Sequence, residues 1–208
     1  MTRLLTLGAL SLLLASVMLQ AGQAPSPTQP VPKGQMPTLG RHTEQTDTVP
    51  LLDFDAYFLG KWTFEWSLPD SALGTAGAIT GSTIVTKRGG ALYEAATAAD
   101  GPAGPFTITE RITYDRENKT MRREVADSRG FSYVQSGTVA GDLGGIYYIH
   151  LESEPFLANG QSVRVRNDLR LLSPLNYRVA TSISVDGGPF TNLGNPWWRK
   201  DLSYVGPP

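Results

Sequence analysis

Three polar side chains interrupt strand faces that are otherwise apolar, and they are the first candidates for chemistry. Glu110 falls between two isoleucines, Gln135 follows Tyr133, and Asn167 falls between a valine and a leucine. A buried carboxylate or amide is costly unless it has a partner, so such residues often face a cavity. If their strands enclose a common interior, these side chains converge on a ligand there. The alternatives are a Glu paired with a neighbouring Arg and an Asn that satisfies the backbone at a bulge.

Two further residues complete the candidate set. His150 shares one strand face with Tyr148 and Glu152, and Tyr177 lies on the apolar face of a later segment. A histidine is the commonest ligand for transition metals and haem in proteins. We therefore keep haem bound through His150 as the one cofactor alternative to an expectation of no cofactor. A hydrogen-bonded structural histidine is the competing interpretation.

Signatures of common enzyme classes are absent from the sequence. It contains no G-x-S-x-G nucleophile motif, no H-E-x-x-H zinc motif and no glycine-rich loop that leads into a helix. With no cysteine and only two histidines, one of them in a Pro-rich segment, the chain lacks the ligands of a multi-histidine or thiolate metal centre. The net charge of −1, with no basic block, argues against nucleic acid as a partner.

The elements that must position these residues are short strands. Apolar residues at three- and four-residue spacing over 51–59 predict one short helix that ends at Gly60. After it, apolar and polar residues alternate in segments separated by turn residues, which is the pattern of β-strands joined by hairpins. The strands begin at Lys61 and continue over 79–87, 91–98, 106–114, 119–126, 131–140, 146–152, 162–171, 177–185 and 197–205.

About ten strands joined by short turns favour an all-β, up-and-down antiparallel barrel of 8–10 strands, because closure removes exposed sheet edges. An outer-membrane barrel is the main rival for an exported β protein. Such a barrel needs an apolar outer band, whereas the segment 162–171 presents Arg164, Arg166 and Arg170 on its non-core face. This division favours a barrel whose outer surface faces water.

The N-terminus predicts export. Arg3 precedes an apolar run from Leu4 to Leu19, and Gly22 and Ala24 form a G-x-A cleavage signal. The run is shorter than a membrane span, which favours a cleaved signal peptide over an anchor. We therefore predict a signal peptide over 1–24, a disordered Pro-rich linker over 25–48, a barrel domain over 49–208, and a periplasmic or secreted location with no membrane span after cleavage.

Several short motifs resemble a known family. The segment Phe58-Leu59-Gly60-Lys61-Trp62 resembles the opening of lipocalin-type (calycin) barrels, where a G-x-W motif begins the first strand. GG-A-L-Y-E at 89–94, I-T-Y-D at 112–115 and a basic-aromatic ending resemble the bacterial lipocalin-like family of unknown function DUF1579. The likeness covers roughly 50–203, and the WWRKDLSYV ending departs from the usual simple strand.

The resemblance implies structural roles rather than catalytic ones. In such barrels Gly60 and Trp62 would belong to the structural motif, and a basic residue of the last strand would cover the Trp ring. Arg199, or Lys200 beside it, would supply that cation–π contact, which contributes roughly 0.5–2 kcal/mol.

Three functions follow from this reading. The first is a carrier of a small apolar molecule, with an open cavity lined by Phe106, Ile108, Tyr133, Val165 and Tyr177. The second is a structural or interaction module whose interior is filled by side chains. The third is a cofactor-free barrel enzyme that uses Glu110 as its acid–base group. We expect the carrier, and a protein that is more a binder than an enzyme.

Overall fold

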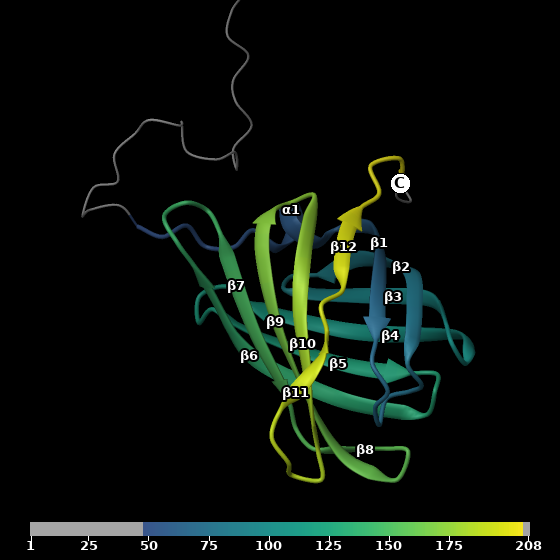
Figure 1. The fold of residues 1–208 in the computed structure, drawn as a ribbon. Helices are drawn as coiled ribbons and strands as arrows, with labels where there is room; N and C mark the ends of the chain where they lie inside the picture. Colours follow the sequence, from purple (N-terminus) through teal and green to yellow (C-terminus); the bar gives the residue numbers. More distant parts are fainter. Residues whose placement is uncertain (1–47, 206–208) are drawn as a thin grey trace, which may run out of the picture. The chain divides into compact units, whose positions relative to one another are not determined.

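The structure is a computed structural model that describes residues 48–205. These residues form one short helix and a closed antiparallel barrel of ten strands (Figure 1). The predicted all-β barrel is therefore confirmed. The predicted signal peptide and nearly all of the predicted linker lie outside the described residues.

The helix α1 covers Phe54–Phe58. The strands of the described residues are β1 (Gly60–Leu68), β2 (Gly77–Gly89), β3 (Leu92–Gly101), β4 (Gly104–Asp115), β5 (Thr120–Asp127), β6 (Phe131–Gly141), β7 (Tyr147–Ser153), β8 (Phe156–Ala158), β9 (Gln161–Ser173), β10 (Asn176–Val185), β11 (Thr191–Gly194) and β12 (Trp197–Lys200).

Strands β1 to β7 pair in chain order, each antiparallel to the next, and β9 continues from β7. Strand β10 pairs with β9, and the short strand β12 lies between β10 and β1, which closes the ring. Strands β8 and β11 pair only with β9 and β10 respectively, as short additions to the barrel. Because β12 has four residues, the seam that it closes is the shortest in the barrel.

Many element boundaries differ from the sequence prediction by a few residues. The helix begins only at Phe54, because the Asp53 side chain accepts a hydrogen bond from Ala56 N at 3.1 Å and caps it. The helix ends just before Gly60, as predicted: Leu59 is its C-cap, and Gly60, with a φ of +108°, opens β1. The last strand stops at Lys200 rather than 205. Strands β8 and β11 were not predicted, since three or four residues are too few for a visible alternation.

Trp62 anchors the helix to the end of the barrel. Its side chain is fully buried, and its Nε1–H donates to Phe58 O at 2.8 Å. Lys200 Nζ lies 5.3 Å from the centre of the Trp62 ring and donates to Ala56 O at 3.3 Å. The structural role expected of Gly60 and Trp62 thus has a physical basis in the contact between α1 and β1.

The basic residue over Trp62 is Lys200 and not Arg199. Trp62 pairs with Lys200 in the sheet register, while Arg199 pairs with Thr63, whose side chain is exposed. Successive side chains of a strand point to opposite faces, so Arg199 lies on the outer face, 5.5 Å from the Trp197 ring. The expectation that Arg199 covers the Trp62 ring was therefore wrong. The covering residue is the next one in sequence, and in a strand neighbouring side chains lie on opposite faces.

No helix among residues 48–205 has the length and apolar character needed to cross a membrane.

Candidate functional site

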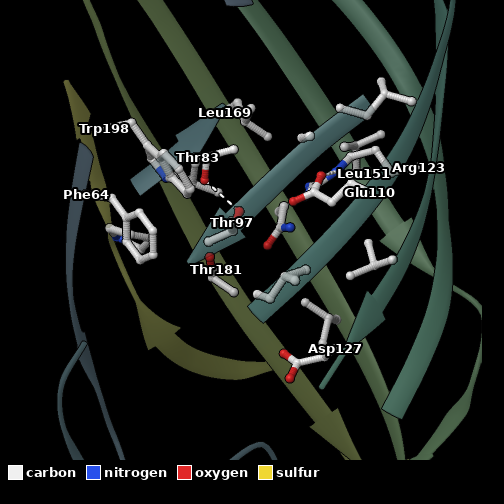
Figure 2. A pocket seen from close by; sticks show the side chains of 18 of the residues that line it. Phe64, Thr83, Thr97, Glu110, Arg123, Asp127, Leu151, Leu169, Thr181 and Trp198 are labelled. Carbon is white, nitrogen blue, oxygen red and sulfur yellow. Dashed lines mark hydrogen bonds and ion pairs between the residues drawn. The ribbon is translucent and has the colours of Figure 1, made fainter. Parts of the chain in front are cut away.

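The barrel encloses a cavity that is lined by side chains from most of its strands (Figure 2). About 160 Å³ is open to the centres of water-sized molecules, whereas one water needs only about 10–15 Å³ by this measure. Most of the lining is aromatic or aliphatic. It includes all five residues that the carrier prediction placed there, Phe106, Ile108, Tyr133, Val165 and Tyr177.

An ion pair lies on the wall of this apolar interior. Glu110 on β4 and Arg123 on β5 both line the cavity, and both side chains are mostly buried, at 11 % and 18 % exposure. Arg123 Nε donates to Glu110 Oε2 at 2.9 Å, and Arg123 Nη2 lies 2.7 Å from the same oxygen in the ion pair. Figure 2 shows the two side chains directed toward each other. The charge of Glu110 is therefore neutralised inside the barrel.

Gln135 and Asn167 extend this ion pair into a hydrogen-bonded network. The fully buried Gln135 accepts hydrogen bonds at its Oε1 from Arg123 Nη1 and from Asn167 Nδ2, each at 3.2 Å. Its own Nε2 donates to Val165 O at 3.2 Å. Asn167 lines the cavity, and its Oδ1 is buried without a hydrogen-bond partner among residues 48–205.

The interior shifts the ionisation of the groups around the pair. Burial raises the pKa of Tyr133 to about 12, and burial also raises the pKa of Tyr177. Burial alone would lower the pKa of Arg123, but the Glu110 carboxylate more than offsets this and the net direction is upward. Both phenols therefore stay neutral and Arg123 stays charged across the physiological range.

A second ion pair lines another part of the cavity. Asp127 at the end of β5 has a side chain only 1 % exposed, and it accepts from Arg129 Nε at 2.9 Å and Nη2 at 2.7 Å. The Arg129 guanidinium lies 4.0 Å from the centre of the Phe106 ring and 5.2 Å from that of Phe131. This pair is also internally neutral.

Buried hydroxyls add neutral polar groups to the lining. The Thr83 and Thr97 hydroxyls, on β2 and β3, lie 2.6 Å apart and hydrogen-bond to each other. Thr181 on β10 also lines the cavity and is labelled in Figure 2. The indole Nε1 of Trp198, another lining residue, is buried without an acceptor among residues 48–205.

The sequence candidates divide into those inside the barrel and one outside it. Glu110, Tyr133, Asn167 and Tyr177 line the cavity, and Gln135 lies behind them in the network. His150 does not join them. It is exposed on the outer face of β7, where its Nδ1 lies 2.5 Å from Asp168 Oδ1 on β9.

The placement of His150 bears on the haem alternative. A haem held inside the barrel needs an inward-facing axial ligand, and His150 faces outward while its neighbours Ile149 and Leu151 face the core. His150 is the one histidine among residues 48–205. These residues therefore do not fit a haem ligated within the cavity. The described part of the chain also has no group of three His, Asp or Glu side chains placed to hold a metal ion.

Sequence reasoning missed three charged residues of the cavity, Arg123, Asp127 and Arg129. The sequence did contain a signal for Arg123 and Asp127. Each lies two residues from Met121 or Val125 along β5, and both of these apolar residues are buried. A charged residue in phase with buried apolar neighbours must share their face. Arg129 follows in the turn after β5, where alternation carries no information.

Comparison with known proteins supports the barrel fold and nothing narrower. No family model matches the sequence, and no curated protein does. Among solved structures, the crystal structure of Rv2717c from M. tuberculosis superposes with a TM-score of 0.59 at 11 % identity, covering 73 % of this chain and 99 % of that one. A fluorescence-activating β-barrel of de novo design matches with a TM-score of 0.42 at 16 % identity, over 73 % and 100 % of the two chains. The fold is thus a β-barrel with structural relatives, while no family match confirms the resemblance to lipocalin-like families.

Proposed function

We propose that this chain is a lipocalin-like barrel protein that binds a small, mainly apolar molecule in its interior. The observation that carries the proposal is the cavity itself, which is enclosed by a closed ring of strands and lined mostly by aromatic and aliphatic side chains. Enclosed sites of this kind, with a few polar groups among apolar walls, are typical of small-molecule binding. A bound molecule would be held by burial of its apolar surface.

The open interior weighs against the module with a filled barrel. In a filled barrel the side chains of facing strands meet and leave no void larger than a water molecule. Here about 160 Å³ remains open, although the surrounding residues include large side chains such as Phe64 and Trp198. The open space is therefore too large for a packing defect, and it favours a barrel with a cavity over a barrel filled by side chains.

An enzymatic role for Glu110 is supported less well. Its Oε2 accepts a hydrogen bond from Arg123 Nε, and Nη2 of the same guanidinium lies 2.7 Å from it. Arg123 is itself engaged with Gln135. Glu110 thus has the surroundings of a structural ion-pair partner rather than those of a free acid–base group.

We also propose that the protein acts in the periplasm or outside the cell. The basis is the sequence pattern of Arg3, the apolar run from Leu4 to Leu19 and the small residues before Pro25. Expression of the full chain in a bacterial host, with cell fractionation and intact-mass measurement, tests this. A cytoplasmic product that retains residues 1–24 would contradict it.

Native mass spectrometry of the full-length protein, purified without detergent, tests the carrier function. Organic extraction then identifies what co-purifies, and thermal-shift measurements follow with a lipid and haem panel. We expect an apolar compound that is lost in Ala95→Phe, which adds a ring inside the cavity, and retained in the control His150→Ala, which alters the outer face. A clean apo mass together with no thermal shift would overturn the proposal.

A further inference from the structure

The orientation of the Asn167 amide is fixed by a chain of hydrogen bonds that starts at the backbone. Val165 O can only accept, so the Gln135 amide must turn its Nε2 toward it. Gln135 Oε1 then faces the opposite way, where it accepts from Arg123 and Asn167. Asn167 must therefore present its Nδ2 to Gln135. Its Oδ1 is left facing away from the network.

This oxygen is an acceptor that the described part of the protein does not use. Asn167 is 92 % buried, it lines the cavity, and its Oδ1 has no donor among residues 48–205. Buried polar atoms in folded proteins almost always have a hydrogen-bond partner, because an unpaired one has lost its contact with water. A donor group of a molecule bound in the cavity that Asn167 lines would satisfy this oxygen.

The charges of the cavity define the occupant further. Its lining contains four charged residues, which form the two pairs Glu110–Arg123 and Asp127–Arg129. Each carboxylate is already matched by a guanidinium, so the lining carries no net charge. An ionised ligand would enter this apolar interior without a counter-charge, which is strongly unfavourable. A neutral ligand avoids that cost.

We infer that the ligand is a neutral, mainly apolar molecule with one hydroxyl or N–H group that donates to Asn167 Oδ1. This inference rests on the proposed function, since it concerns the ligand of the same cavity. The hydroxyl of such a ligand provides the donor that Asn167 lacks, and its apolar body meets the aromatic and aliphatic walls. Anionic lipids and fatty acids are disfavoured, and neutral phenols and alcohols are the favoured class.

A matched series of two-ring probes tests this on the full-length protein. Naphthalene reports apolar binding alone, 2-naphthol adds a donor, 2-methoxynaphthalene keeps the oxygen but removes the donor, and 2-naphthoate adds a negative charge. Dissociation constants come from calorimetry or tryptophan quenching. We expect 2-naphthol to bind about tenfold more tightly than 2-methoxynaphthalene, which corresponds to one satisfied buried hydrogen bond, and 2-naphthoate to bind most weakly.

The variant Asn167→Leu should remove the preference for 2-naphthol and leave naphthalene binding in place. The control His150→Leu, which changes an exposed side chain on the outer face of β7, should keep the preference. If Asn167→Leu fails to fold, the comparison of 2-naphthol with its ether in the wild-type protein remains decisive.

The outcomes separate the inference from the function beneath it. If naphthalene binds but the two oxygenated probes do not differ, or if the preference survives in Asn167→Leu, the inference is overturned and the carrier function stands. Tighter binding of 2-naphthoate than of 2-naphthol would likewise overturn it. If none of the probes binds and nothing co-purifies, the proposed function itself fails.

Discussion

Inside the barrel, Arg123 Nε on β5 donates to Glu110 Oε2 on β4 at 2.9 Å, and Arg123 Nη2 lies 2.7 Å from the same oxygen. The contact is diagonal, because the register places Arg123 opposite Ile112 and Glu110 opposite Val125. A diagonal neighbour on the same face of a sheet is within reach of a long side chain. The pair thus joins two adjacent strands through their inner faces and sets the charge balance of the cavity.

Breaking this pair should destabilise the protein more than removing it entirely. Glu110→Leu or Arg123→Leu leaves one buried charge without its partner, and we expect each to lower the free energy of unfolding by about 3 kcal/mol. The double variant should be substantially more stable than the sum of the two losses predicts. Urea unfolding of the four proteins gives the coupling energy. Strictly additive losses would mean that the two charges are not coupled in solution.

The Phe64 ring occupies space that is free only because Gly81 has no side chain. The two residues are directly paired across β1 and β2, and a Cβ at Gly81 would lie 2.7 Å from Phe64 Cε1 and 2.7 Å from Ala98 O. On its other side Phe64 stacks on Trp198, with ring centres 4.3 Å apart. The ring is therefore held between a glycine and an indole, and it cannot move aside freely.

Gly81→Ala should therefore lower the free energy of unfolding by about 1–3 kcal/mol, as overpacking does elsewhere. The second-site change Phe64→Leu should recover part of this loss, since it removes the ring that the new methyl group meets. Ser82→Ala, the next position on the same strand, is the matched control and should stay within about 0.5 kcal/mol of the wild type. Equal stability of Gly81→Ala and Ser82→Ala in denaturant titrations would argue against this packing.

The strand pattern made most of the fold predictable, and it also explains the errors in the site. Glu110 and Asn167 could be placed inside because each stands in phase with apolar neighbours on its own strand. His150 was assigned to the cavity, but the strand face that it shares with Tyr148 and Glu152 is the polar outer face of β7. The core face of that strand is the alternate set, Tyr147, Ile149 and Leu151, and all three are buried.

Other features could not be derived from a single strand at all. That Arg123 pairs with Glu110 depends on the register between β4 and β5, which local alternation does not give. The orientation of Asn167 depends on Gln135, 32 residues away in sequence. The choice of Lys200 over Arg199 depends on how β12 meets β1 across the closing seam. Pairings between strands distant in sequence are set by closure of the whole barrel.

Lys200 should contribute to stability where its neighbour Arg199 does not. Lys200→Ala removes the ammonium over the Trp62 ring and the hydrogen bond to Ala56 O, and we expect a loss of about 0.5–2 kcal/mol. Arg199→Ala removes a side chain from the outer face and should change stability by less than about 0.5 kcal/mol. Thermal unfolding of both variants measures the difference. If Arg199→Ala lost more stability than Lys200→Ala, the assignment of Lys200 to the Trp62 side and of Arg199 to the outer face would be wrong.

The buried phenols predict a loss of stability in alkali. Burial raises the pKa of Tyr133 to about 12 in the folded protein, whereas an exposed tyrosine titrates near 10. Between these values the folded state keeps a proton that the unfolded state has released, so the unfolded state binds fewer protons and stability falls as pH rises. Below about pH 10 both states hold the proton and the contribution is complete.

We therefore expect the free energy of unfolding to decline from about pH 10, by up to about 1.4 kcal/mol per pH unit for each such phenol. Tyr177, whose pKa is also raised by burial, adds to the slope. Urea titrations between pH 8 and 11.5 measure it, and phenolate absorbance follows ionisation directly. Tyr133→Phe should give a shallower decline than the wild type, because one titrating group is lost. An unchanged slope in that variant would mean that water reaches the Tyr133 hydroxyl freely, and the cavity would then be open to solvent rather than enclosed.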